Sequence, residues 1–361
     1  MVTKRMELWN KYHRKRLRER LLPFLGKKWI TDSGLSFTED VLHACLDAYR
    51  REEKSVDPKK YMEKLLSIAD NLSEKVKKAG GTENAAKESI KYFISHNNIP
   101  SQRHTYNLID ILDTIDDEEN RNANCLGKTT LFACLAEMVD HNLFSKLRKV
   151  DIPSHTFIRI KEANGDRDIE TTAPYSEMEG NSTGIGVEYD IKMCIADILY
   201  SFADTNIYEE EILNKILNRF PNHESSLYKK AWIALWRKGN ISEAEKYINE
   251  ALKILPECPY SLELKGDIEN RKDSKERARE YYRKALSSMY TVLDNEGDFK
   301  IKLLKKRLKV SEELGDEEDA VYCKANLLAF EGKYDEAMSL LGNLTNPSRE
   351  DIKLFILFNL V

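Results

Sequence analysis

The sequence predicts a mainly helical protein with one small α+β core near its middle. Fifteen glycines and nine prolines are few for 361 residues, and a 33% share of charged residues suits long solvated helices better than many tight β-turns. Two short β-rich runs occur between about residues 155 and 172, and the chain has helical periodicity before and after them. We therefore expect a helical N-terminal region at 1–115, the core at 116–190 and helical repeats at 191–361.

The N-terminal region consists of amphipathic segments. The runs "FTEDVLHACLDAYRREE" and "DPKKYMEKLLSIADNLSEKVKKAG" carry apolar residues at three- and four-residue steps, which is the pattern of helices with one buried side. Residues 1–28 hold ten lysines or arginines against two glutamates. Such a segment could contact nucleic acid or another acidic surface, but its apolar residues at roughly helical spacing favour a helix with a solvated basic face.

Charge, hydropathy and cysteine spacing predict the cellular compartment of the protein. The net charge is only −4, so the whole molecule is not an obvious polyanion binder. No stretch approaches ~18 consecutive apolar residues, so we expect no membrane span, and no cleavable leader follows the basic start. The six cysteines are Cys45, Cys125, Cys134, Cys194, Cys258 and Cys323. Their spacing fits neither disulfides nor metal ligands, so we expect reduced thiols in the cytoplasm and no bound metal or cofactor.

The last third contains an internal repeat. Ala244 and Ala251 recur 34 residues later as Ala278 and Ala285, which is the period of a tetratricopeptide unit. Small residues at these positions let paired helices approach closely. We expect four to six antiparallel helices stacked as a short α-solenoid, which would bind a protein or peptide partner.

The stretch "NANCLGKTTLF" admits two chemistries. Gly127, Lys128 and Thr129 could close a phosphate-binding P-loop, in which glycine amides surround the phosphates and the lysine reaches the terminal ones. However, the position of the first glycine holds Asn122, and the acidic run "DTIDDEENR" upstream cannot form a buried strand. We therefore prefer the second chemistry, which centres on Cys125.

A helix that begins at Cys125, with Asn124 or Asn122 as its N-cap, would place the thiol on its first turn. The unpaired amides and the macrodipole at that point stabilise a thiolate, which is the nucleophilic form. A lone cysteine is more often a small core residue than a nucleophile. A base near Cys125 is therefore needed to support the functional interpretation.

His155 is the candidate base, because it is the one histidine that opens an expected strand, "HTFIRI". Asp168 and Glu170 lie on the partner run "RDIETT" and could orient its imidazole. A cysteine at a helix start, a histidine on one strand and a carboxylate on the next supply a nucleophile, a base and an orienting group.

These stretches resemble the transglutaminase-like (papain-like) superfamily, particularly its prokaryotic SirB-type branch, over about residues 55–290. "NANCLGKTTLFACLAE", "IPSHTFIRI" and "DIETT" occur in the family's order and precede tetratricopeptide-like repeats, as is often the case in that branch. The resemblance implies that Cys125 is the nucleophile and His155 the base. Glu170 then stands where the superfamily usually has aspartate.

The strand register does not decide which carboxylate orients His155 as the third member of the catalytic triad. A strict two-residue turn at Asn164-Gly165 would set Glu170 opposite Arg159, roughly 13 Å along the sheet from His155 at the usual strand rise. A contact between His155 and Glu170 therefore requires a bulge or a longer loop. The alternative is a cross-strand ion pair between Arg159 and Glu170, with Asp168 as another possible orienting carboxylate.

Two functions follow as hypotheses. The first is a transglutaminase-like cysteine hydrolase or acyl transferase that acts on a protein or peptide amide through a thioester at Cys125, with the repeats binding a partner. The second is a catalytically inactive scaffold or regulator that keeps the same core for its shape. Family resemblance alone does not separate the two.

Overall fold

A computed structural model describes residues 36–51, 57–96, 108–116, 123–152, 155–171, 186–203, 209–288 and 297–342. The chain divides into two compact units, Met1–Pro221 and Asn222–Val361, which are described separately below. The three-part division expected from the sequence remains a prediction, and the basic residues 1–28 lie outside the described ranges. No helix within those ranges is long and apolar enough to cross a membrane.

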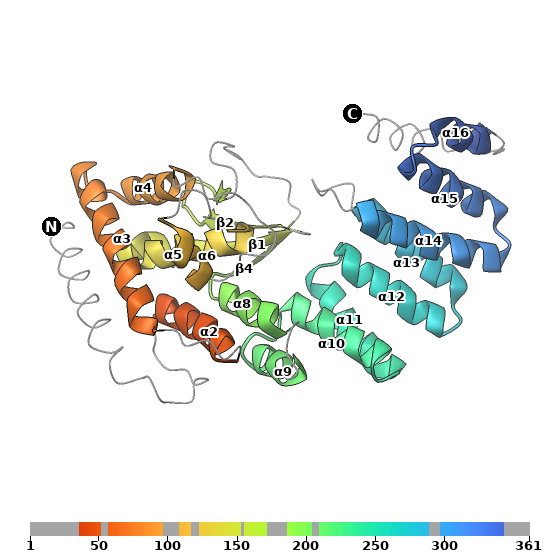
Figure 1. Ribbon diagram of the computed structural model, residues 1–361, viewed down its shortest axis with the longest axis horizontal. Helices are drawn as coiled ribbons and strands as arrows, with labels where there is room; N and C mark the ends of the chain where they lie inside the picture. The colour runs from red at the N-terminus through yellow and green to blue at the C-terminus, as the bar shows by residue number, and fades with distance from the viewer. Residues whose placement is uncertain are drawn as a thin grey trace. The chain divides into compact units, whose positions relative to one another are not determined.

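The first unit is built around helix α6 (Cys125–Val139), which is buried from Gly127 onward (Figure 1). A helix with few charges on any side has to be covered on all sides, and α6 contacts six other helices and one strand. The other helices of this unit are α2 (Phe37–Arg51), α3 (Pro58–Lys78), α4 (Glu83–His96), α5 (Leu108–Thr114), α7 (His141–Ser145), α8 (Met193–Ala203) and α9 (Glu209–Arg219).

A buried carboxylate on α6 fixes the start of α2. Glu137 accepts hydrogen bonds from the backbone amides of Phe37 and Thr38, both at 2.8 Å, and from the Thr38 hydroxyl at 2.6 Å. These amides belong to the first turn of α2, where no backbone partner is available within the helix. Glu137 therefore joins two elements that lie about a hundred residues apart in the chain.

A four-stranded antiparallel sheet in the order β3-β2-β1-β4 completes the unit. The expected strand "HTFIRI" is β2, and the expected partner run supplies β3. The sequence did not predict the other two strands. The bounds are β1 (Leu147–Ile152), β2 (His155–Ile160), β3 (Arg167–Ile169) and β4 (Val187–Asp190).

The connection between β2 and β3 is longer than a two-residue turn. Arg159 lies opposite Asp168, and the Gly165 amide donates to the Glu162 carbonyl at 3.2 Å. The tight part of the loop is therefore one residue earlier than the expected Asn164-Gly165 turn, and that prediction is wrong. The longer loop shifts the register by two positions and moves Glu170 closer to His155 than the strict turn would allow.

The second unit is a series of helices in which each packs on the next (Figure 1). Its described part holds seven helices rather than the expected four to six: α10 (Glu224–Trp236), α11 (Ile241–Ile254), α12 (Pro259–Arg271), α13 (Lys275–Ser288), α14 (Gly297–Leu314), α15 (Glu317–Phe330) and α16 (Tyr334–Gly342). The four alanines that predicted the repeat are fully buried, as close packing of paired helices requires. The close packing of α12 on α13 also requires a glycine at position 266, because an added Cβ would lie 2.5 Å from the Tyr282 ring.

Candidate active site

Cys125 is the first residue of α6, as the sequence predicted. Asn124 is the N-cap, and its side-chain oxygen accepts a hydrogen bond from the Gly127 amide at 2.9 Å. This bond satisfies one of the free amides of the first turn and fixes where the helix begins. The thiol therefore lies at the positive end of a long buried helix, where negative charge is favoured.

Cys125 also differs from the other cysteines in its exposure. All six lie in described ranges and none forms a disulfide, but Cys125 alone is partly exposed while the other five are buried. The five buried cysteines are Cys45, Cys134, Cys194, Cys258 and Cys323. Burial raises the pKa of each of these thiols, because apolar surroundings disfavour the charged form. Reagents and substrates can therefore reach one thiol of the six.

His155 opens β2 and contacts both other members of the predicted triad. Its Nε2 lies 2.6 Å from Oε2 of Glu170, and the side chain is close enough to Cys125 for the two groups to affect each other's charge. The imidazole is partly buried and the Glu170 side chain is 7% exposed, so water screens their interaction only weakly. The structure thus brings Cys125, His155 and Glu170 together at one place.

The surroundings of His155 favour its protonated form. Burial lowers the pKa of His155, but the interactions with Cys125 and with the hydrogen-bonded Glu170 outweigh burial and raise the pKa to about 10. At neutral pH the imidazole is therefore positively charged and holds a proton that it can donate.

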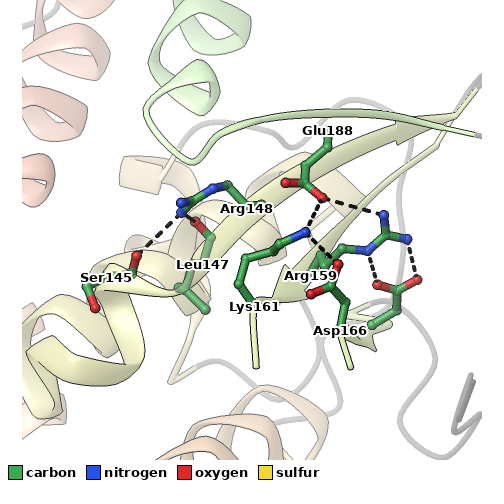
Figure 2. Close-up of polar contacts among 8 residues, drawn as sticks. Ser145, Leu147, Arg148, Arg159, Lys161, Asp166 and Glu188 are labelled. Atoms are coloured by element: carbon green, nitrogen blue, oxygen red, sulfur yellow. Dashed lines mark hydrogen bonds and ion pairs between the residues drawn. The ribbon is translucent and has the colours of Figure 1, made fainter. Parts of the chain in front are cut away.

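Asp168, the other possible orienting carboxylate, has a different partner. Arg159 donates to Asp168 from Nε at 2.6 Å and from a terminal nitrogen at 2.9 Å, so the pair is bidentate. Figure 2 shows Arg159 and Lys161 meeting at Glu188 of β4, at 3.6 and 3.2 Å. The Arg159 guanidinium therefore pairs with Asp168 and Glu188. The alternative ion pair between Arg159 and Glu170 does not form.

One charged residue near the site was not predicted to belong to it. Lys128 lies three positions after Cys125 on α6 and is only 4% exposed. Burial lowers the pKa of its ammonium, while the nearby charges of Glu170 and Cys125 act in the opposite direction. The sequence drew attention to Lys128 only through the P-loop pattern. Its spacing from Cys125 was the signal that could have placed it here, because residues three apart share a helix face.

No group of three or more His, Cys, Asp or Glu side chains in the described ranges is arranged to hold a metal ion. The residues brought together at Cys125 are those of nucleophilic and acid–base chemistry.

Comparison with known proteins identifies the second unit more clearly than the first. Residues 224–258 and 259–288 match a family model described as tetratricopeptide repeat. No curated protein matches the sequence. Among solved structures, the chain is similar to menin, in a crystal structure described as revealing the binding site for the Mixed Lineage Leukemia (MLL) protein. The identity is 11% over 89% of this chain and 88% of the menin chain, with a TM-score of 0.45.

The tetratricopeptide match supports binding of a protein partner by these repeats. None of these comparisons supports the transglutaminase-like resemblance, which depends on the residues of the site themselves.

Proposed function

We propose that the protein is a transglutaminase-like cysteine hydrolase or acyl transferase, acting on a protein or peptide amide that the tetratricopeptide repeats help to capture. The observation that carries the proposal is the grouping of Cys125, His155 and Glu170, with Cys125 at a helix N-terminus, His155 2.6 Å from Glu170, and Cys125 near enough to act on the charge of His155. Six free cysteines are in keeping with a reducing cytoplasm, and the SirB-type resemblance suggests a prokaryotic one.

The roles of the three residues follow from their positions. The Cys125 sulfur attacks the carbonyl carbon of the amide and forms a C–S bond, while the charged His155 donates its proton to the amide nitrogen. The C–N bond then breaks, the amine leaves, and a thioester remains on Cys125. Glu170 keeps the imidazole oriented and stabilises its charge during this step.

The second half of the reaction restores the enzyme. Neutral His155 takes a proton from the incoming nucleophile, which attacks the thioester carbon and displaces the Cys125 thiolate. Water as nucleophile gives hydrolysis or deamidation, and an amine gives a transferred or cross-linked product. The same acyl-enzyme serves all of these outcomes.

The alternative function is a scaffold without catalysis. It is favoured by one observation, which is that the family match covers only the repeats at 224–288. A scaffold has no need for a reactive thiol, so the two functions differ in the chemistry of Cys125.

Labelling of the folded protein distinguishes the two. A chloroacetamide probe at pH 7, followed by peptide mapping, should modify Cys125 at least ~100-fold faster than Cys134, because only the thiolate of an accessible cysteine reacts. Cys134 is the internal control, since it lies on the same helix and is buried. Modification of Cys125 only after unfolding would favour the scaffold.

A further inference from the structure

The side chain of Lys128 is a buried cation beside the proposed nucleophile. Residues three apart on a helix have Cβ atoms about 5–6 Å from each other, so Lys128 and Cys125 lie on the same face of α6. The ammonium is close enough to Cys125 and Glu170 to interact with both electrostatically. The residue as a whole is only 4% exposed, and its ammonium is not among the fully buried polar atoms that lack a partner, so the tip of the side chain can be reached from outside.

Lys128 is the exception among the buried lysines of the described ranges. Lys149 forms an ion pair with Asp197 at 2.8 Å, and Lys265 forms one with Glu245 at 2.9 Å. Lys87 contacts Glu88 at 3.0 Å. In this part of the chain no carboxylate forms an ion pair or a hydrogen bond with the Lys128 ammonium.

Glu170, the carboxylate whose charge acts on Lys128, already has another partner. Glu170 is hydrogen-bonded to His155 at 2.6 Å, and this contact satisfies the oxygen that faces the imidazole. An ammonium that lies beside the nucleophile without an ion pair to a described carboxylate is available to bind an anion. A negative group that arrives with the substrate would supply the missing partner.

We propose that Lys128 is the residue that recognises an anionic group on the substrate, and that the preferred acyl donors carry a carboxylate or similar anion within a few bonds of the carbon that Cys125 attacks. This inference rests on the function proposed above. It specifies the substrate class, because a neutral acyl group would leave the ammonium without an ion pair in the complex, whereas an anionic group would form one.

Thiol reagents of different charge test the inference on the full chain without a natural substrate. Methanethiosulfonates that carry a sulfonate or a hydroxyl two carbons from the reacting sulfur are compared on Cys125, each rate being divided by the rate with 2-mercaptoethanol. The wild-type protein should react at least ~10-fold faster with the sulfonate reagent, as one nearby charge at intermediate dielectric predicts. A wild-type ratio near one would overturn the inference without any variant.

Two lysine variants separate the effect of Lys128 from that of His155, which is also positively charged. Lys128→Met keeps the apolar stem and removes the charge, so the sulfonate preference should fall by about tenfold while the hydroxyl reagent reacts within about threefold of wild type. Lys87→Met removes a buried lysine charge on α4 and should leave the preference unchanged. Lys128→Arg should retain the preference, which guards against a Lys128→Met variant that fails to fold.

The outcomes separate this inference from the proposed function. If Lys128→Met and wild type have the same preference, the inference is wrong while the reactivity of Cys125 stands. If Cys125 in the folded protein reacts with neither reagent, the proposed function and the inference both fail.

Discussion

Nε2 of His155 lies 2.6 Å from Oε2 of Glu170, although the two residues are not opposite each other in the β2–β3 pairing. Arg159 is opposite Asp168, so the continued register places Glu170 opposite Phe157, on the same face as His155 and two positions away. The contact is therefore diagonal. The longer side chain of glutamate suits this geometry better than aspartate, because a diagonal neighbour is about 7–8 Å away rather than about 5 Å.

This geometry predicts how strongly each carboxylate variant should slow the alkylation of Cys125. Glu170→Asp should shorten the reach and Glu170→Gln should remove the charge, and either change should slow alkylation of Cys125 at pH 7 by roughly tenfold or more. Asp168→Asn should have a much smaller effect, because Asp168 pairs with Arg159. Rate constants for iodoacetamide on each purified variant measure the order. Equal slowing by Asp168→Asn and Glu170→Gln would contradict the assignment of Glu170.

The raised pKa of His155 predicts a dependence of stability on pH. The folded-state pKa of about 10 exceeds the ordinary value of 6.5, so protonated His155 stabilises the fold fully below about pH 6.5. This contribution is lost as the pH rises toward 10. The difference in urea midpoint between wild type and His155→Gln should therefore shrink from pH 6 to pH 10. A difference that stays the same from pH 6 to pH 10 would contradict the raised pKa of His155.

Glu137 provides a test of the first unit's packing. Glu137→Ala would leave the amides of Phe37 and Thr38 without acceptors in a buried position, which should lower the free energy of unfolding by about 2–4 kcal/mol. Urea denaturation followed by far-ultraviolet circular dichroism measures this change. Glu63→Ala, at an exposed position on α3, should change it by less than about 0.5 kcal/mol. A similar cost for both variants would show that Glu137 does not hold α2 on α6.

Gly266 provides the corresponding test in the second unit. An alanine Cβ there would lie 2.5 Å from Cε1 of Tyr282, whose hydroxyl is held by Asp267 at 2.8 Å. Because the ring cannot easily move, Gly266→Ala should cost about 1–3 kcal/mol. Gly297→Ala meets nothing within 4 Å and should be close to neutral. Thermal unfolding of the two variants gives the comparison, and a neutral Gly266→Ala would mean that Tyr282 can relax.

The local part of the site could be predicted from sequence. Asn124 as a cap and Cys125 as the first helical residue depend on neighbours within a few positions, and the strand that begins at His155 has a strong β-rich pattern. The tetratricopeptide period is likewise visible in the alanines alone.

The parts that depend on distant residues could not be predicted. Strand β1 contains Lys149, a buried charge that makes the run look unlike a strand until Asp197 on α8 is known to pair with it. The contact between His155 and Glu170 depends on the length of the loop that joins their strands, which the turn residues alone specified wrongly. That Lys128 forms no ion pair with a carboxylate of the described ranges can be seen only in the folded structure.

The central claim is that Cys125 and His155 work as a pair, and the pH dependence of alkylation at Cys125 tests it most directly. The rate constant for iodoacetamide is measured by peptide mass spectrometry from pH 5 to pH 10 in wild type and in His155→Ala. Loss of the positive imidazole should move the rate profile of Cys125 to higher pH, because the thiolate loses a positive neighbour. Superimposable profiles for the two proteins, or a Cys125 that reacts only after denaturation, would contradict the account.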